Sequence, residues 1–186
     1  MKIYFTGATS FNVEQKDKDK SLGGYMSSTT VPNDIFSNLF GEVSMYGLDE
    51  KLRETRALII TNESKDDLTN LYIWFDKLND ALGKFEIAAV LPTVEESTGE
   101  VYMETIDNIR ATPYTGNFVE ADTVANKKLI ANTMLSKSYI GLWIRRTLTA
   151  ADKEQFNCDT MYAKYKEDNN SELTTEGGVG ITLEWD

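Results

Sequence analysis

The segment at residues 139–148, with the sequence YIGLWIRRTL, constrains the fold more than any other part of the chain. Its residues alternate between two faces, which is the period-two pattern of a β-strand, and many of them are β-branched or aromatic. Apart from Arg146, one face carries only apolar residues, namely Ile140, Leu142, Ile144 and Leu148. The pattern predicts a buried strand around which the rest of the chain is organised.

The opposite face of this strand carries Tyr139, Trp143, Arg145 and Thr147. Arg145 and Arg146 follow directly after a Trp-Ile pair, which indicates a strand that leaves the core and presents two cations near its end. These cations have two possible partners, the carboxylates of the same chain or the acidic surface of a neighbouring chain. The sequence leaves both interpretations open.

Period-two patterns recur along the chain, and they predict further strands at residues 2–6, 55–62, 68–75, 85–91, 100–106, 129–131, 161–165 and 179–186. Short helical turns are expected at residues 35–40 and, from a capping box at 149–152, through Phe156, and no long helix is expected. Because six polar residues join them, the strands at 55–62 and 68–75 are expected to form an antiparallel pair. The predicted fold is all-β, an antiparallel β-sandwich of about seven or eight strands with an N-terminal arm and long loops.

Strand spacing also predicts the core. The apolar positions that recur with this period are Leu58, Ile60, Ile73, Ile87, Val101, Ile140, Leu142, Ile144 and Ile181. At 186 residues the chain is long enough to bury one such core.

The chain is expected to divide into an N-terminal strand and arm at residues 1–34 and a β-sandwich domain at residues 35–186. Within the arm, Leu22, Tyr25 and Met26 flank the paired glycines Gly23 and Gly24. Paired glycines suit a backbone that lies closely against another surface. That surface belongs either to the same chain or to a neighbouring subunit. Because the arm is rich in polar residues and glycine, we expect residues 7–30 to be mobile in an isolated subunit and ordered only against neighbours.

The balance of charge limits the partners. Thirty acidic and nineteen basic residues give a net charge of −11, so the surface repels phosphate backbones. No apolar run approaches the length of a membrane span. We therefore expect no nucleic-acid partner, sequence-specific or otherwise, and no membrane partner.

The residue types present argue against catalysis. The chain has no histidine and a single cysteine, Cys158, which excludes Ser-His and Cys-His nucleophiles and the usual zinc sites. No calcium-loop spacing is present. The carboxylate pairs Glu95 with Glu96 and Asp76 with Asp80 do not predict a glycosidase, because sequence neighbours on a turn point apart. We expect no catalytic, cofactor-binding or metal-binding residues.

A set of aromatic side chains allows one further interpretation. These residues are Tyr72, Trp74, Tyr102, Tyr139 and Trp143. They would suit a carbohydrate-binding face, but alternating aromatic residues are also typical of cross-strand packing in a half-buried sheet.

Three stretches resemble structural proteins of tailed-bacteriophage virions, especially those of crAss-like phages. The first is NLFGEVS at residues 38–44 followed by ETRALIITN at 54–62, similar to a family pattern "LFD-is" and then "E-YR-iyi-N", with Thr55 where the family usually has Tyr. The second is the strand at 68–76. The third is the strand at 139–148, similar to "ig-LWirRt", with ITLEW at 181–185 closing the chain.

The resemblance implies a β-sandwich building block of the connector, neck or tail that functions in assembly. It implies a homo-oligomeric cyclic ring, with other virion proteins such as portal, neck or tail proteins as partners, located in the virion and assembled in the host cytoplasm. Residues expected at the subunit interface are Leu22, Gly23, Gly24, Tyr25, Met26, Arg145 and Arg146. The alternative function is a carbohydrate-binding β-sandwich module.

Overall fold

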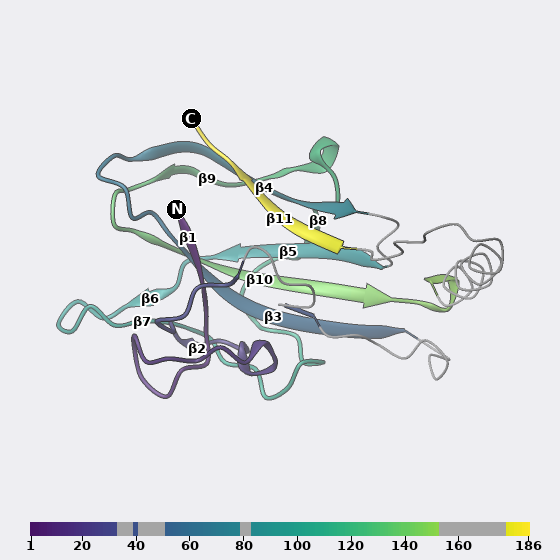
Figure 1. Ribbon diagram of the computed structural model, residues 1–186, viewed down its shortest axis with the longest axis horizontal. Coiled ribbons are helices and arrows are strands. Elements are labelled where there is room, and N and C mark those ends of the chain that lie inside the picture. The colour runs from purple at the N-terminus through teal and green to yellow at the C-terminus, as the bar shows by residue number, and fades with distance from the viewer. Residues whose placement is uncertain (33–38, 41–50, 79–82, 153–177) are drawn as a thin grey trace, which may run out of the picture.

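The structure is a computed structural model, and it describes residues 1–32, 39–40, 51–78, 83–152 and 178–186 (Figure 1). The described residues form eleven strands: β1 (Lys2–Phe5), β2 (Gly24–Tyr25), β3 (Leu52–Thr61), β4 (Leu68–Leu78), β5 (Lys84–Val90), β6 (Thr93–Val94), β7 (Val101–Met103), β8 (Val119–Glu120), β9 (Lys128–Met134), β10 (Tyr139–Leu148) and β11 (Gly178–Glu184). Two 3₁₀ turns, η1 (Lys18–Lys20) and η3 (Val124–Asn126), accompany them. None of the helical segments described in the structure is long and apolar enough to cross a membrane.

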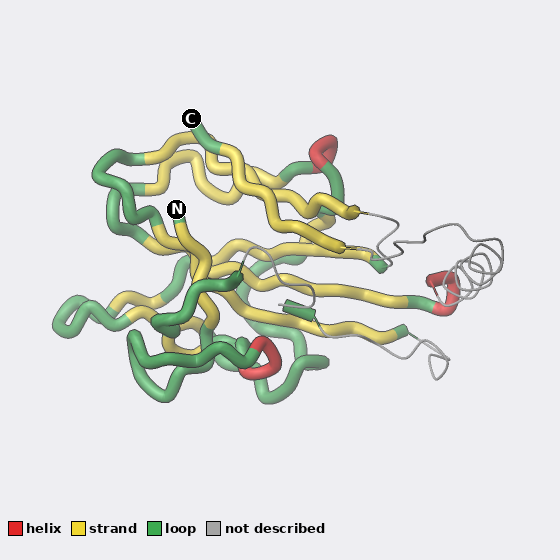
Figure 2. The backbone as a smooth tube through the Cα atoms, in the orientation of Figure 1, coloured by secondary structure: helices red, strands yellow, loops and turns green. Residues whose placement is uncertain are grey.

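The strands form three antiparallel sheets, as Figures 1 and 2 show. The central sheet has the order β1-β3-β10-β5-β8, the flanking sheet β11-β4-β9 and the small sheet β2-β7-β6. The central sheet lies between the other two. The all-β, antiparallel, sandwich-like class predicted from the sequence is therefore confirmed. The strands that the sequence did not predict, β2, β6 and β8, have two residues each, too few to show a periodic pattern.

The sequence predicted that the strands at 55–62 and 68–75 pair with each other, and this prediction is wrong. β3 pairs with β1 and β10, whereas β4 pairs with β9 and β11 in the flanking sheet. The polar residues between them carry the chain from one sheet to the other. Asn62 organises this crossing, because its side-chain amide donates to the backbone oxygens of Asp66, Met134 and Leu135 at 2.9, 3.2 and 3.2 Å.

The first core lies between the central and flanking sheets. Most of its buried residues come from β3, β4, β5 and β10, and they include most of the predicted core: Leu58, Ile60, Ile73, Ile87, Ile140, Leu142 and Ile144. Ile181 is only partly buried against this core, because its strand β11 lies at the edge of the flanking sheet.

A second core lies on the opposite face of the central sheet, against the small sheet and the N-terminal arm. Trp143 is fully buried there, and its register partners on both sides are alanines, Ala57 on β3 and Ala88 on β5, which leave room for the indole ring. Val101, predicted as core, belongs to this second cluster. Gly141 lets the small sheet approach, because a Cβ on it would lie 3.0 Å from the sulfur of Met103.

The N-terminal arm packs on this second face, so the structure contradicts the expectation that residues 7–30 become ordered only against a neighbour. The backbone N–H of Ala57 donates to the oxygen of Ser21 at 2.7 Å, and that of Met26 donates to the oxygen of Val101 at 2.9 Å. Gly23 has a φ of +91°, and a Cβ on it would lie 1.7 Å from the oxygen of Glu104. The close approach predicted from the paired glycines is therefore made within one chain.

Some sequence predictions lie outside the described residues. The strand at 161–165 and the boundary between residues 34 and 35 fall there, and of the helical turn at 35–40 only Leu39 and Phe40 are described. Because β1 shares a sheet with β3, the N-terminal strand and the sandwich are joined through the central sheet.

We expect replacement of Leu142 by Ala to lower the free energy of unfolding by about 2 to 5 kcal/mol, and Trp143→Ala by about 3 to 5 kcal/mol. The two side chains are neighbours on β10 but fill opposite cores. Urea denaturation is the measurement, with Tyr114→Ala as the control because Tyr114 is fully exposed. A loss below about 0.5 kcal/mol for either core variant would contradict a strand buried on both faces.

We also expect the backbone amides of Met26 and Ala57 to exchange slowly with deuterium in the isolated chain, since both are hydrogen-bonded beneath the second core. Hydrogen exchange followed by mass spectrometry measures this. Rapid exchange of these two amides in a proven monomer would mean that the arm needs a neighbouring subunit.

Candidate functional site

Arg145 and Arg146, expected at a subunit interface, form ion pairs with glutamates of the same chain. The Nε of Arg145 donates to Oε2 of Glu86 on β5 at 3.0 Å, and the Nε of Arg146 donates to Oε2 of Glu54 on β3 at 3.0 Å. Each arginine stands directly opposite its glutamate in the strand register. The sequence left open whether these arginines pair with carboxylates of the same chain or of a neighbouring chain. In the structure, their partners are carboxylates of the same chain.

Aromatic rings cover both ion pairs. The Cζ of Arg145 lies 3.8 Å from the centre of the Phe118 ring, and the Cζ of Arg146 lies 5.0 Å from that of Phe40. Burial raises the pKa of the Glu86 carboxyl, but the hydrogen bond and charge of Arg145, together with the charges of Lys84 and Arg53, lower it more, so this pKa lies below its ordinary value. The pairs are largely shielded from water and act within the fold.

A third arginine extends the cluster under Phe40. Arg56 is almost fully buried, and its Nη2 donates to Oδ1 of Asp19 in the N-terminal arm at 2.5 Å. Its Cζ lies 5.5 Å from the centre of the Phe40 ring. This contact ties the arm to the central sheet by charge as well as by backbone hydrogen bonds.

The arm residues expected at the interface also make contacts within the chain. Met26 is buried and Leu22 packs against the second core. The Tyr25 ring meets that of Tyr102 edge-on, with 5.7 Å between ring centres. A role for these residues at a subunit interface stays a prediction, and their contacts within one chain direct attention to other surfaces.

The aromatic set considered for carbohydrate binding does not form one platform. Trp143 is enclosed in the second core and Trp74 is buried on β4. Tyr72 also lies on β4, in the flanking sheet, while Tyr102 lies on β7 in the small sheet. The structure thus distributes these rings over three sheets.

The carboxylates show structural roles where the structure describes them. Glu104 accepts hydrogen bonds from the backbone N–H groups of Tyr114 and Thr115 at 2.7 and 2.8 Å. Glu95 and Glu96 are exposed in the turn after β6, and Asp80 lies outside the described residues. Among the described residues no group of three or more Cys, Asp or Glu side chains is placed to hold a metal ion.

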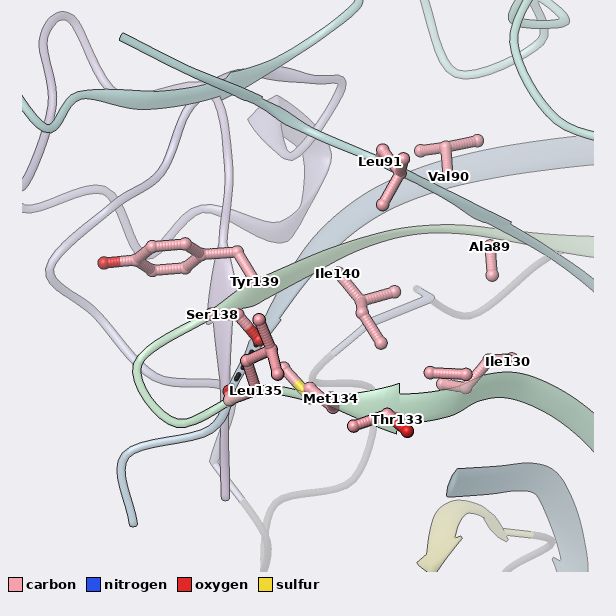
Figure 3. Close-up of a pocket in the computed structure, with 11 residues that line it drawn as sticks. Ala89, Val90, Leu91, Ile130, Thr133, Met134, Leu135, Ser138, Tyr139 and Ile140 are labelled. Carbon is pink, nitrogen blue, oxygen red and sulfur yellow. Dashed lines mark hydrogen bonds between the residues drawn. The ribbon is translucent and has the colours of Figure 1, made fainter. Parts of the chain in front are cut away.

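Among the described residues, an apolar groove of about 320 Å³ lies at one edge of the sandwich (Figure 3). The end of β5, the length of β9 and the start of β10 line it. The lining residues are Ala89, Val90, Leu91, Ile130, Ala131, Thr133, Met134, Leu135, Ser138, Tyr139 and Ile140. Figure 3 shows Ala89 and Ile130 facing each other across it, while the Tyr139 ring points away.

A bulge in β9 shapes this groove. Ala131 stands opposite Leu71 and Leu129 stands opposite Tyr72, so Ile130 is the extra residue of the strand. Bulges of this kind turn a side chain out of the regular alternation, and here the turned side chain is a lining residue of the groove.

The lining carries no charged residue, although the chain has a net charge of −11. The hydroxyl of Ser138 is already engaged, because it donates to the backbone oxygen of Leu135 at 2.7 Å. Leu91 and Leu135 at the rim are both exposed. Exposed leucines around an uncharged groove are typical of a surface that contacts another apolar molecule.

Sequence reasoning did not identify this groove. The one local signal is Leu91, which lies between the end of β5 and Pro92, where an apolar side chain has no neighbouring strand position to cover it. The proximity of β5 and β9 depends on how two different sheets stack, which strand periodicity does not encode.

Comparisons with protein families, with curated proteins and with solved structures found no match to this chain.

We expect Glu86→Gln to lower the free energy of unfolding at neutral pH by about 1 to 3 kcal/mol, because the amide leaves the Arg145 cation without its counter-charge. The folded-state pKa of Glu86 is lowered, so the pair stabilises fully above the ordinary pKa of 4.5, and this contribution is lost as the pH falls through the lower folded-state value.

Denaturation at a series of pH values tests this. The variant should lose part of the acid dependence of the wild type. Glu120→Gln is the control, because the Glu120 carboxylate makes a more exposed pair with Lys84. Identical pH profiles for wild type and Glu86→Gln would exclude a stabilising role for this pair.

Proposed function

We propose that the chain is a structural subunit of a tailed-phage particle, which assembles into a symmetric ring in the connector, neck or tail and has no catalytic role. Its partners are other copies of itself and neighbouring virion proteins. The proposal rests on the resemblance of the strands and on the way these strands meet in space.

One observation carries the proposal. The residues of two resembling stretches that lie far apart in the sequence belong to one buried cluster: Phe40 and Glu54 come from the first, and Arg146 from the third. The second stretch forms β4, which supplies the first core with Leu71, Ile73 and Phe75. A chance likeness of short motifs has no reason to select residues that contact one another, so this convergence supports a shared architecture.

The surface chemistry supports an assembly role over a carbohydrate-binding one. Sugar-binding faces need exposed aromatic rings on a common surface, and the rings of this chain are distributed over three sheets. The groove is uncharged and apolar, with exposed leucines at its rim, and such surfaces suit contacts between proteins.

We expect the chain to be present in purified particles of its source and to form a ring of cyclic symmetry there. Mass spectrometry of the particles followed by cryo-electron microscopy makes the test. In purified form, identical subunits carrying −11 each should repel, so they should sediment as monomers at low salt and associate more readily as salt rises. Absence of the chain from intact particles would refute the proposal.

A further inference from the structure

The groove lies between β5 and β9, where the described residues place no strand. At one end the two sheets are joined: β8 pairs with β5 at Glu86 and Ile87, and the residue after β8, Ala121, accepts a hydrogen bond from the N–H of Phe75 on β4 at 2.7 Å. The N–H of Ala121 also donates to the oxygen of Phe85 at 3.5 Å. β8 and Ala121 thus connect the central and flanking sheets.

Past this junction the sheets separate. In the part of the chain that the structure describes, no strand pairs with β5 beyond Ile87 on the side away from β10, and none pairs with β9 on the side away from β4. The strands β5 and β9 form two walls of the groove, and Figure 3 shows Ile140 at the start of β10 between them. Unpaired strand edges present rows of N–H and C=O groups that can hydrogen-bond to another extended chain.

The groove is less suited to a small molecule. Sites for small molecules place a few polar groups so that they converge on the ligand, within about 300 to 1,000 Å³. Here the volume is about 320 Å³, the Ser138 hydroxyl is bonded to Leu135, and the Tyr139 ring points away from the groove. The groups that remain to recognise a ligand are the Thr133 hydroxyl, the backbone edges and the apolar lining.

The charge of the chain narrows the choice of occupant. A second copy would bring another −11 to the surface, so a partner of opposite charge is favoured. An uncharged lining gives acidic side chains no counter-charge, whereas the net charge of −11 on the chain attracts basic ones. The occupant that fits is therefore extended, apolar at alternate positions and free of acidic residues.

We propose that the groove between β5 and β9 binds such an extended segment of a different protein, which adds a strand beside β5 and continues the line of β8. Apolar side chains of the segment lie against Ala89, Ile130 and Ile140, and its backbone pairs with a free strand edge. This inference rests on the proposed function only in placing the partner among the neighbouring virion proteins.

The test uses fluorescent peptides of the form acetyl-Lys-Val-Thr-Val-Thr-Val-Lys-amide. In further peptides the valines are replaced in turn by leucine, isoleucine and phenylalanine. Binding to the full chain is measured by fluorescence anisotropy. At least one peptide should bind, and methylation of its central backbone nitrogens should weaken binding by about tenfold or more, because the charge is unchanged but ladder donors are lost. Replacing both lysines by glutamate should also weaken it.

Matched variants locate the site. Leu91→Arg with Leu135→Arg should abolish binding, whereas Tyr114→Arg with Val124→Arg should not, because it adds the same charge at positions of equal exposure: 91% and 59% for the first pair, 100% and 58% for the second. All four positions are on the surface, so both variants should fold.

The contrary outcomes are distinct. No binding by any peptide at millimolar concentration, equal binding of the methylated peptide, or equal loss in both double variants would overturn the proposal. Self-association that only Leu91→Arg with Leu135→Arg removes would assign the groove to a second copy instead. Peptide binding by a chain that is absent from phage particles would refute the proposed function and leave the groove assignment intact. A chain that is present in the particles but binds no peptide would overturn the groove assignment and leave the proposed function intact.

Discussion

The burial of β10 on both faces is the constraint on which the rest of the structure depends. This strand pairs along its length with β3 and along most of it with β5, so its backbone is held inside the central sheet. Leu142 and Trp143, neighbours in sequence, fill separate cores on opposite faces. Since a sheet buried on both faces needs a cover on each, the flanking sheet and the N-terminal arm with the small sheet follow from it.

Two cross-strand ion pairs help to fix the register of β10 against the neighbouring strands. Arg145 meets Glu86 on one face of the sheet and Arg146 meets Glu54 on the other. A slip of one residue in strand pairing would move each side chain to the opposite face and separate both charge pairs in a poorly solvated site. Apolar residues alone tolerate many registers, so these pairs favour one register over its neighbours. Residues that sequence reasoning treated as interface candidates thus serve the fold.

The contrast between the two ends of the sandwich bears on function. At the end near Phe40 the charges are paired and covered by aromatic rings, while at the groove an uncharged surface lies between two separated strands. Stable folding and recognition of a partner make opposite demands. Folding requires that polar groups bond to one another within the chain, whereas recognition requires backbone groups that remain available to bond to a partner. A closed core beside an open edge meets both demands.

The sequence by itself determined the all-β class, the main long strands and most of the first core, because side-chain periodicity and local burial are properties of a single strand. Leu58, Ile60, Leu142 and Ile144 were identifiable on that basis. Only the tertiary structure decided that β3 and β4 belong to different sheets and that the arm covers the second face, because the order of strands depends on how faces stack. For the same reason, only the tertiary structure revealed the groove, which lies where β5 and β9 diverge. The two strands belong to separate sheets, and the residue pattern of either strand carries no information on the distance between them.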